Sequence, residues 1–170
     1  MELETERLII SQLALSDAPF FLELVNDPDW IRFIGDRQVR TIEDAKSYLK
    51  NRIIASYSKE GFGFHKVCLK SSNVPIGITG LIHRNELSAP DIGFAFLASG
   101  RKQGFAYEST RAVYDMAINQ LKIDPILAIA NQDNIRSHKL LNKLGLRFQQ
   151  LIQLSDEDQE ICLFSNEESS

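Results

Sequence analysis

The residues best suited to chemistry in this chain lie between an apolar segment and a helical one. Ile92–Leu97 is predicted to form a strand, and a helical pattern runs from Gly104 to about Leu121. Between them, Arg101 supplies a planar cationic fork, Gly104 lets a ligand approach the backbone closely, and Ala106 keeps the next turn narrow. The first turn of a helix carries N–H groups without intrahelical partners and a partial positive charge. The segment therefore predicts an anion site suited to a pyrophosphate.

Two plainer interpretations of this loop remain open at this point. It can be a strand-to-helix turn in which the glycine serves geometry and the arginine faces solvent. A Rossmann dinucleotide-binding domain also places glycines between a strand and a helix. That fold is disfavoured, because G-x-G-x-x-G is absent and three consecutive strand candidates precede the loop, where strands and helices should alternate.

Three further segments extend the pattern. Thr5–Ile10 reads TERLII, Asn131–Ser137 reads NQDNIRS, and Leu140–Phe148 reads LLNKLGLRF. Together with Arg101, Gly104 and the alanine that follows, these segments resemble the GCN5-related N-acetyltransferases (GNAT), whose acetyl-CoA loop reads Arg/Gln-x-x-Gly-x-Gly/Ala. The branch they resemble is that of the ribosomal-protein N-terminal (RimJ/RimL-like) acetyltransferases. The matches occur in order from residue 5 to about residue 148.

The resemblance implies an acetyl-CoA-dependent N-acetyltransferase that transfers acetyl to a primary amine directly, in a ternary complex. It implies that the backbone N–H of Leu97 donates to the thioester oxygen. Four of the residues that the resemblance assigns to the cofactor also have a purely structural interpretation. Phe96 and Leu97 can belong to the strand core, and Asn134 and Ser137 can be a helix N-cap and a polar third residue of that helix. The cofactor-binding residues implied are Phe96, Leu97, Ala98, Arg101, Lys102, Gln103, Gly104, Phe105, Ala106, Asn134 and Ser137.

The amine must lose a proton, and the candidate bases are Glu86, Asp91 and His83, near the ends of the two strands before the loop. In this branch an acidic residue often precedes an Ile-Gly pair, and Asp91 takes that position with a shorter side chain. A solvated turn carboxylate is the alternative for Asp91. Many members of the family that this chain resembles carry a tyrosine after the second cofactor helix as general acid, but no tyrosine follows Tyr114 here. Ser137 is then the remaining candidate, by position, for the proton donor to the leaving thiolate. Alternatively no acid is used, since a thiol pKa near 8.5 makes thiolate a fair leaving group.

The acceptor pocket is expected between the first two helices and the sheet. The variable segment Asp27–Phe33 lies there, and Trp30 either lines the pocket or covers the core. A peptide α-amine is the leading acceptor. Residues 101–150 carry a charge of +4 and the remainder −8, and this acidic surplus would attract basic N-termini. A small-molecule amine is one alternative, and a non-catalytic acyl-CoA-binding or sensor module is the other.

Periodicity predicts a mixed α/β or α+β domain, and the resemblance implies a largely antiparallel central sheet in the order β-α-α-β-β-β-α-β-α-β-β. Residues 1–164 are expected to form a single acetyltransferase domain, and residues 165–170 a flexible tail. Helices are expected after Ser16, after Thr41, from Gly104 and over Asn134–Leu144, with a break at Asn26–Asp29. The expected strands are Leu3–Leu13, Gly63–Lys70, Pro75–Arg84, Ala89–Leu97, Ile126–Ala130, Arg147–Leu154 and Glu160–Phe164.

Bulk properties exclude several classes of protein. The 170 residues suit one domain, and 44% hydrophobic with 25% charged residues are globular values. A net charge of −4 argues against general nucleic-acid binding. Neither a signal peptide nor a membrane span is apparent, which favours a soluble cytoplasmic protein, as monomer or homodimer. No metal is expected, because the three histidines lack partners at ligand spacing. Cys68 and Cys162 are expected to be core residues.

Overall fold

A mixed eight-stranded sheet organises the part of the chain that the computed structural model describes, residues 2–155 and 159–168. The strand order is β1-β2-β3-β4-β5-β6-β8-β7, and every neighbouring pair is antiparallel except β5 and β6. The predicted mixed, largely antiparallel sheet is therefore confirmed. The strands are β1 (Leu3–Glu4), β2 (Leu8–Gln12), β3 (Phe64–Leu69), β4 (Pro75–Ile82), β5 (Asp91–Phe96), β6 (Leu127–Ala130), β7 (Arg147–Ile152) and β8 (Ile161–Ser165).

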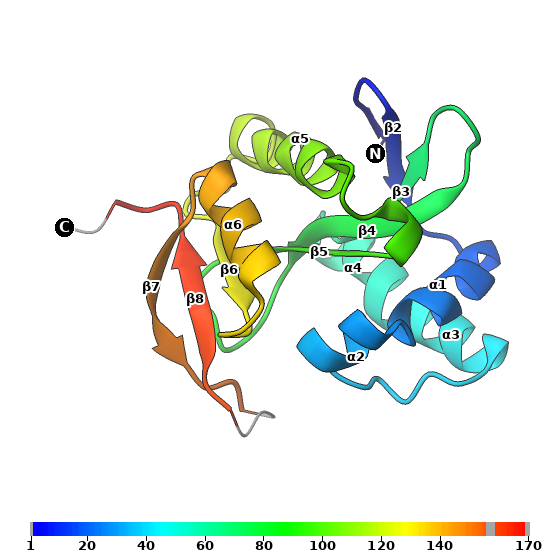
Figure 1. The fold of residues 1–170 in the computed structure, drawn as a ribbon, viewed down its shortest axis with the longest axis horizontal. Helices are drawn as coiled ribbons and strands as arrows, with labels where there is room; N and C mark the ends of the chain where they lie inside the picture. Colours follow the sequence, from blue (N-terminus) through cyan, green and yellow to red (C-terminus); the bar gives the residue numbers. More distant parts are fainter. Residues whose placement is uncertain (1, 156–158, 169–170) are drawn as a thin grey trace.

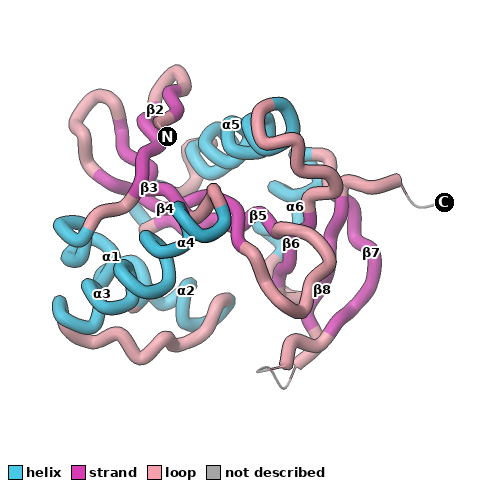
Figure 2. The backbone as a smooth tube through the Cα atoms, turned by 180° about the vertical axis from the view of Figure 1, so that it is seen from behind, coloured by secondary structure: helices cyan, strands magenta, loops and turns pink. Residues whose placement is uncertain are grey.

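Helices cover both faces of this sheet (Figures 1 and 2). One face carries α1 (Ala18–Val25), α2 (Pro28–Phe33), α3 (Ile42–Tyr48), the π-helical segment η2 (Leu49–Ile54) and α4 (Ala55–Glu60). The other carries α5 (Phe105–Asn119), with α6 (Ile135–Leu144) beside β6 and β8. Two short 3-10 turns, η1 (Leu15–Asp17) and η3 (Ala98–Gly100), complete the order.

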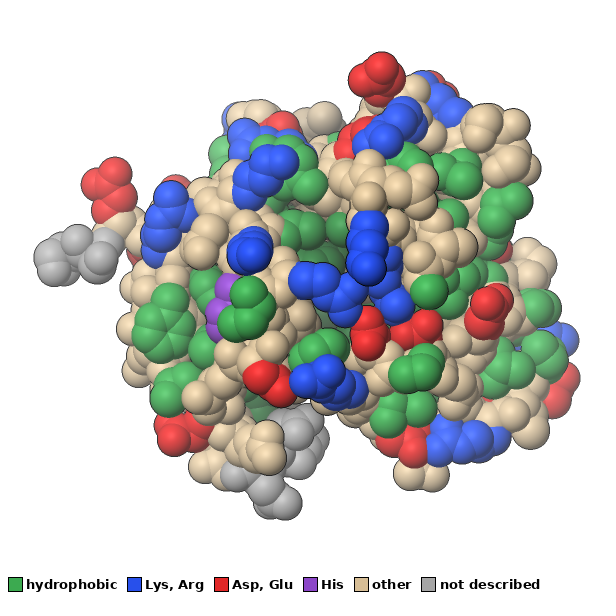
Figure 3. All heavy atoms as spheres, in the orientation of Figure 1, with side chains coloured by type: hydrophobic (Ala, Val, Ile, Leu, Met, Phe, Trp, Pro, Cys, Tyr) green, Lys and Arg blue, Asp and Glu red, His purple; other side chains and the backbone are tan. Residues whose placement is uncertain are grey.

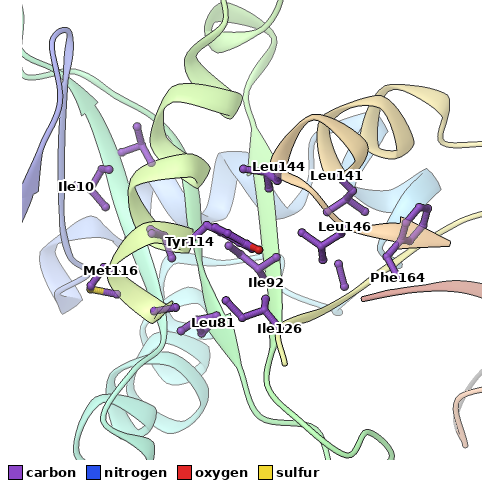
Figure 4. Packing of buried hydrophobic residues seen from close by; sticks show 14 of the residues in the cluster. Ile10, Leu81, Ile92, Tyr114, Met116, Ile126, Leu141, Leu144, Leu146 and Phe164 are labelled. Carbon is purple, nitrogen blue, oxygen red and sulfur yellow. The ribbon is translucent and has the colours of Figure 1, made fainter. Parts of the chain in front are cut away.

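Each face of the sheet has its own hydrophobic core. The first core joins β2, β4, β5, α5 and α6 and includes the fully buried Ile10, Leu81, Ile92 and Phe164 (Figure 4). The second packs the helices α1–α3 and η2 against β4 through Ile78. All residues of β4 between its two ends are buried, as expected of a central strand covered on both faces. The sheet between the two cores is the rigid frame that positions the site.

Two expected boundaries near the N-terminus are wrong. Leu3–Leu13 is divided, because Thr5 N–H donates to the Leu8 carbonyl at 3.0 Å and Leu8 N–H donates to the Thr5 hydroxyl at 3.2 Å. This hydroxyl-closed turn makes β1 and β2 a hairpin. The break expected at Asn26–Asp29 is short, because Asp27 caps a new helix by accepting the Asp29 N–H at 3.0 Å.

The predicted start of the tail is also too early. Ser165 is the last residue of β8 and is buried. The Asn166 side chain accepts the Ile126 N–H at 2.9 Å and donates to the Tyr114 hydroxyl at 3.1 Å, so it is tied to the domain. Residues 169–170 of the predicted tail lie outside the described residues.

Candidate active site

The edge of β5 that faces β6 is open along most of its length. The two parallel strands pair at Asp91 and Leu127, at the start of both strands, and separate beyond that point. On its other edge β5 remains paired with β4. The separation therefore leaves backbone groups of β5 without a neighbouring strand, in the interior of a sheet.

Register decides which groups these are. The Leu97 N–H donates to the Ile76 carbonyl at 2.9 Å, so it points toward β4. Successive residues of a strand direct their backbone groups to opposite edges, so Phe94 and Phe96 direct theirs toward the open side. The expected role of Leu97 as donor to the thioester oxygen is therefore wrong. Its N–H already belongs to the sheet, and the position one residue earlier is the open one.

The loop after β5 ends in an exposed helix N-terminus. Gly104 takes a φ of +83° and caps α5, and Lys102 takes a φ of +64°, so the chain folds back into the first turn. Glu108 N–H donates to the Gly104 carbonyl at 3.0 Å. The N–H groups of the three preceding residues have no intrahelical partner. These N–H groups are available to an anion, as the predicted cradle requires.

Arg101 does not project freely into this cradle. Its guanidinium contacts Asp27 at 2.6 Å and Asp29 at 3.4 Å, at the start of α2. Arg136 of α6 also binds Asp29, at 2.5 Å, and this hydrogen bond is the main cause that lowers the pKa of the Asp29 carboxyl. The cationic fork expected to meet phosphate therefore has carboxylate partners, and α2 is bound to both the loop and α6.

A single cleft of about 1560 Å³ brings most of the predicted site together. Figure 3 shows Lys and Arg side chains around the hollow in the middle of this face, with acidic side chains directly below them. Leu97, Ala98 and Gln103 are predicted cofactor residues that do not line the cleft. The predicted residues that do line it are His83, Glu86, Asp91, Phe96, Arg101, Lys102, Gly104, Phe105, Ala106, Asn134 and Ser137.

The start of α6 forms another wall of this cleft. The Asn134 side chain accepts the Ser137 N–H at 3.4 Å, which is the arrangement of a helix N-cap. Both side chains nevertheless line the cleft. The plainer reading of Asn134 is therefore confirmed, and it is compatible with a cofactor role.

Asp91 is the buried acid of the site. It is the first residue of β5, it is 1% exposed, and Arg84 Nε lies 3.2 and 3.3 Å from its two carboxylate oxygens. Burial raises the pKa of Asp91 to about 6, against the lowering effect of Arg84. The alternative reading of Asp91 as a solvated turn carboxylate is therefore wrong.

The two other base candidates lie at the exposed rim. Glu86 accepts a hydrogen bond from the Ser155 hydroxyl at 2.9 Å, and this bond is the main cause that lowers the pKa of its carboxyl. His83 is also exposed. Of the two carboxylates, only Asp91 has the raised pKa that favours proton transfer near neutral pH.

Trp30 belongs to both the core and the cleft. Its side chain is 7% exposed and packs edge-on against Phe21, with ring centroids 6.4 Å apart. It also borders the cleft, and its buried indole N–H has no hydrogen-bond partner among the described residues. The sequence pattern assigned no site role to Arg84 or Arg136, and it included Asp29 only as part of the variable segment Asp27–Phe33.

Other chemistry finds little support in the described residues. Within residues 2–155 and 159–168, no group of three or more His, Cys, Asp or Glu side chains is placed to hold a metal ion. Over the same ranges no helix combines the length and apolar character that a membrane crossing requires. Cys68 and Cys162 are buried free thiols whose pKa values are raised by burial, and neither lines the cleft.

Comparisons with known proteins agree with this geometry. Residues 7–147 match the model of a family described as acetyltransferase (GNAT) domain. The N-acetyltransferase YnaD of Bacillus subtilis (strain 168) is 26% identical over 148 residues, which are 86% of this chain and 83% of YnaD. An acetyltransferase from Agrobacterium tumefaciens str. C58 superposes with a TM-score of 0.84 at 20% identity, over 99% of this chain and 95% of that chain. RimL, described as a ribosomal L7/L12 alpha-N-protein acetyltransferase in complex with coenzyme A, gives a TM-score of 0.82 at 14% identity over 97% of both chains. The chain therefore belongs to the GNAT family and is an acetyl-CoA-dependent N-acetyltransferase.

Proposed function

We propose that this enzyme acetylates the α-amine of a peptide, with acetyl-CoA and the peptide bound together in the cleft. The observation that carries the proposal is Asp91, a buried carboxylate with a pKa of about 6 at the point where β5 and β6 separate. An α-ammonium has a pKa of about 7.7–8.0 and a lysine ammonium about 10.4. Proton transfer to Asp91 is therefore uphill by about 2–3 kcal/mol from an α-ammonium, but by about 6 kcal/mol from lysine.

The residues present fit the cofactor. Phosphates would bind the free N–H groups of the first turn of α5, close to Gly104 and Lys102. The pantetheine amides would pair with the open backbone groups of Phe94 and Phe96. Bound acetyl-CoA supplies the activated thioester, and α6 with Asn134 and Ser137 closes the other side of the cleft.

Direct transfer is supported by the size of the cleft and by the position of the cysteines. At about 1560 Å³ the cleft exceeds the roughly 300–1,000 Å³ of a pocket for one small ligand, so two substrates can be held together. An acyl-enzyme formed on a cysteine would need a thiol in the cleft, whereas Cys68 and Cys162 are buried in β3 and β8 away from it. As the amine nitrogen bonds to the acetyl carbon and the carbon–sulfur bond breaks, Asp91 accepts the amine proton and Arg84 holds the Asp91 carboxylate. The Ser137 hydroxyl donates a hydrogen bond to the sulfur, which leaves as thiolate.

A peptide acceptor also agrees with the fold. RimL is described as an acetyltransferase for the α-amine of ribosomal L7/L12, so the same fold serves that reaction in another protein. Glu86 has a lowered pKa and lies exposed at the rim, so its proposed contribution is attraction of a cationic substrate and not strong base catalysis.

The test compares two short basic peptides through release of CoA. One has a free N-terminus, and the other has the same sequence with a blocked α-amine and its lysines retained. We expect kcat/KM to fall by at least about a hundredfold on blocking, because the remaining lysine ammonium groups have a pKa about 2.4–2.7 units above that of an α-ammonium. Equal rates would contradict an α-amine acceptor, and a small-amine panel would then identify the class. Binding of acetyl-CoA without turnover on any amine would favour a sensor module.

A further inference from the structure

The TERL segment near the N-terminus lies against the proposed phosphate cradle, 101 residues away from Glu108 in sequence. The Thr5 hydroxyl donates to Glu108 Oε2 at 2.5 Å, and the Arg7 backbone N–H donates to the same oxygen at 3.0 Å. Arg7 Nε donates to Glu108 Oε1 at 2.8 Å. The turn that divides β1 from β2 thus binds both oxygens of one carboxylate in α5.

Arg7 also contacts the residues of the cradle on either side of the helix start. Its guanidinium carbon lies 4.3 Å from the centroid of the Phe105 ring. Its Nη2 atom is 3.4 Å from the point that a β-carbon on Gly104 would occupy. Arg7 does not line the cleft, whereas Gly104 and Phe105 do. Its influence on a ligand therefore passes through the first turn of α5.

The charge of Glu108 makes this contact consequential. Glu108 is the one acidic residue in the first turn of α5. Burial raises the pKa of Glu108, but the hydrogen bonds from Thr5 and Arg7 outweigh burial and hold the pKa below its ordinary value. The carboxylate is therefore ionised at neutral pH. A negative charge there favours the free helix N-terminus, but it repels phosphates bound to the same turn.

We infer that Arg7 is a positioning residue for acetyl-CoA: it neutralises Glu108 and holds its carboxylate on the hairpin side, so that the first turn of α5 stays attractive to phosphate. The inference rests on the proposed function, because it assumes that the phosphates bind this turn. A purely structural staple between the hairpin and α5 makes a different prediction. In that case the packing of Arg7 would matter, and its charge would not.

Arg7→Met separates charge from packing, because it keeps an unbranched stem over the Phe105 ring and removes the guanidinium. Glu108→Gln removes the opposing charge at nearly constant shape. Glu4→Gln is the matched control, since Glu4 lies in the same hairpin and pairs with Lys70 at 3.4 Å, away from α5. Acetyl-CoA affinity is measured by calorimetry on the full chain, with melting temperatures recorded for every variant.

At about 0.05 M salt we expect Arg7→Met to raise the Kd of acetyl-CoA about tenfold and to raise its KM with kcat unchanged. The loss should shrink to less than about threefold at about 0.5 M salt, because exposed charges are then screened. The double variant Arg7→Met/Glu108→Gln should bind within about threefold of the wild type, because the uncompensated carboxylate is gone. Glu4→Gln should match the wild type.

Wild-type affinity in Arg7→Met would overturn the inference, as would a loss that persists both in the double variant and at high salt. The second result would mean that Arg7 acts through packing. Failure of the wild-type protein itself to bind acetyl-CoA would instead overturn the proposed function. The two failures are therefore distinguishable in one set of titrations.

Discussion

Replacing Asp91 with asparagine should make the protein more stable and less active at neutral pH. The pKa of Asp91 is raised from an ordinary 3.8 to about 6 by burial. Because one pKa unit corresponds to about 1.4 kcal/mol, ionising Asp91 destabilises the folded state by about 3 kcal/mol at pH values above 6. Asparagine retains the size and hydrogen-bonding ability of the carboxyl group without the charge.

The pH dependence fixes the sign of the effect. The folded protein holds the Asp91 proton more tightly than the unfolded chain, so this group stabilises the fold fully below about pH 4. That contribution is lost as the pH rises through about 6. The pKa of about 6 already includes the lowering effect of the ion pair with Arg84, so we expect the free energy of unfolding of the variant to exceed that of the wild type by about 2–3 kcal/mol at pH 7.5. At pH 4 the two proteins should differ little from this cause.

Denaturant unfolding at about pH 4, 5, 6 and 7.5, on both sides of the pKa of Asp91, measures the difference in the free energy of unfolding. The kcat/KM of Asp91→Asn for a free-N-terminal peptide should fall by about 10²–10⁴, and the acid limb near pH 6 should disappear. Asp115→Asn is the control, since Asp115 also pairs with an arginine, Arg111 at 3.2 Å, but its side chain is half-exposed on α5. Unchanged kcat/KM with the acid limb retained would refute Asp91 as the base. A stability difference that does not depend on pH would refute the raised pKa.

Two further variants probe the cradle and α2. Gly104→Glu should remain folded and lose acetyl-CoA binding, because its carboxylate would meet the phosphates. The control is Gly61→Glu, which has a similar φ of +78° and open space around it, and it should bind acetyl-CoA normally. Loss of binding in both would mean that backbone strain alone is responsible. Asp27→Asn should lower the free energy of unfolding by about 1–2 kcal/mol, since it removes the charge that Arg101 contacts at 2.6 Å. The affinity of Asp27→Asn for acetyl-CoA should not weaken, because Arg101 becomes available to phosphate. Weaker binding would show that Asp27 orients Arg101 for the cofactor.

The elements that follow local rules were predictable from the sequence. The cradle depends on a glycine with positive φ and on the start of a helix, and both are encoded within a few residues of Gly104. The three antiparallel strands β3, β4 and β5 follow from apolar segments separated by polar loops. The helix α2 has a local signal as well, an aspartate followed by proline, but the same pair is typical of a break.

Other features of the site depend on pairings that no local pattern specifies. Whether Leu97 or Phe96 presents a free N–H depends on the register of β5 against β4, and a shift of one residue exchanges them. The raised pKa of Asp91 depends on its burial beside β6, and Arg84, from the loop after β4, partly counteracts that burial. The neighbours of Asp91 in sequence indicate a turn, and only the tertiary structure removes water from it.

Charged residues of the site form ion pairs in which an arginine from one segment binds a carboxylate from another. Arg101 binds Asp27 across 74 residues, and Arg136 binds Asp29 across 107. The Arg101–Asp27 pair is largely buried, and the Arg136–Asp29 pair is short, at 2.5 Å. Both pairs therefore fix the position of α2 more than a pair of flexible surface charges would. The positive total of residues 101–150 therefore overstates the charge available to a ligand, because Arg101 and Arg136 are already compensated. The attraction for phosphate must come mainly from the helix N-terminus of α5 and from the lysines of residues 101–150 that line the cleft and are in no ion pair within residues 2–155 and 159–168, which are Lys102, Lys139 and Lys143.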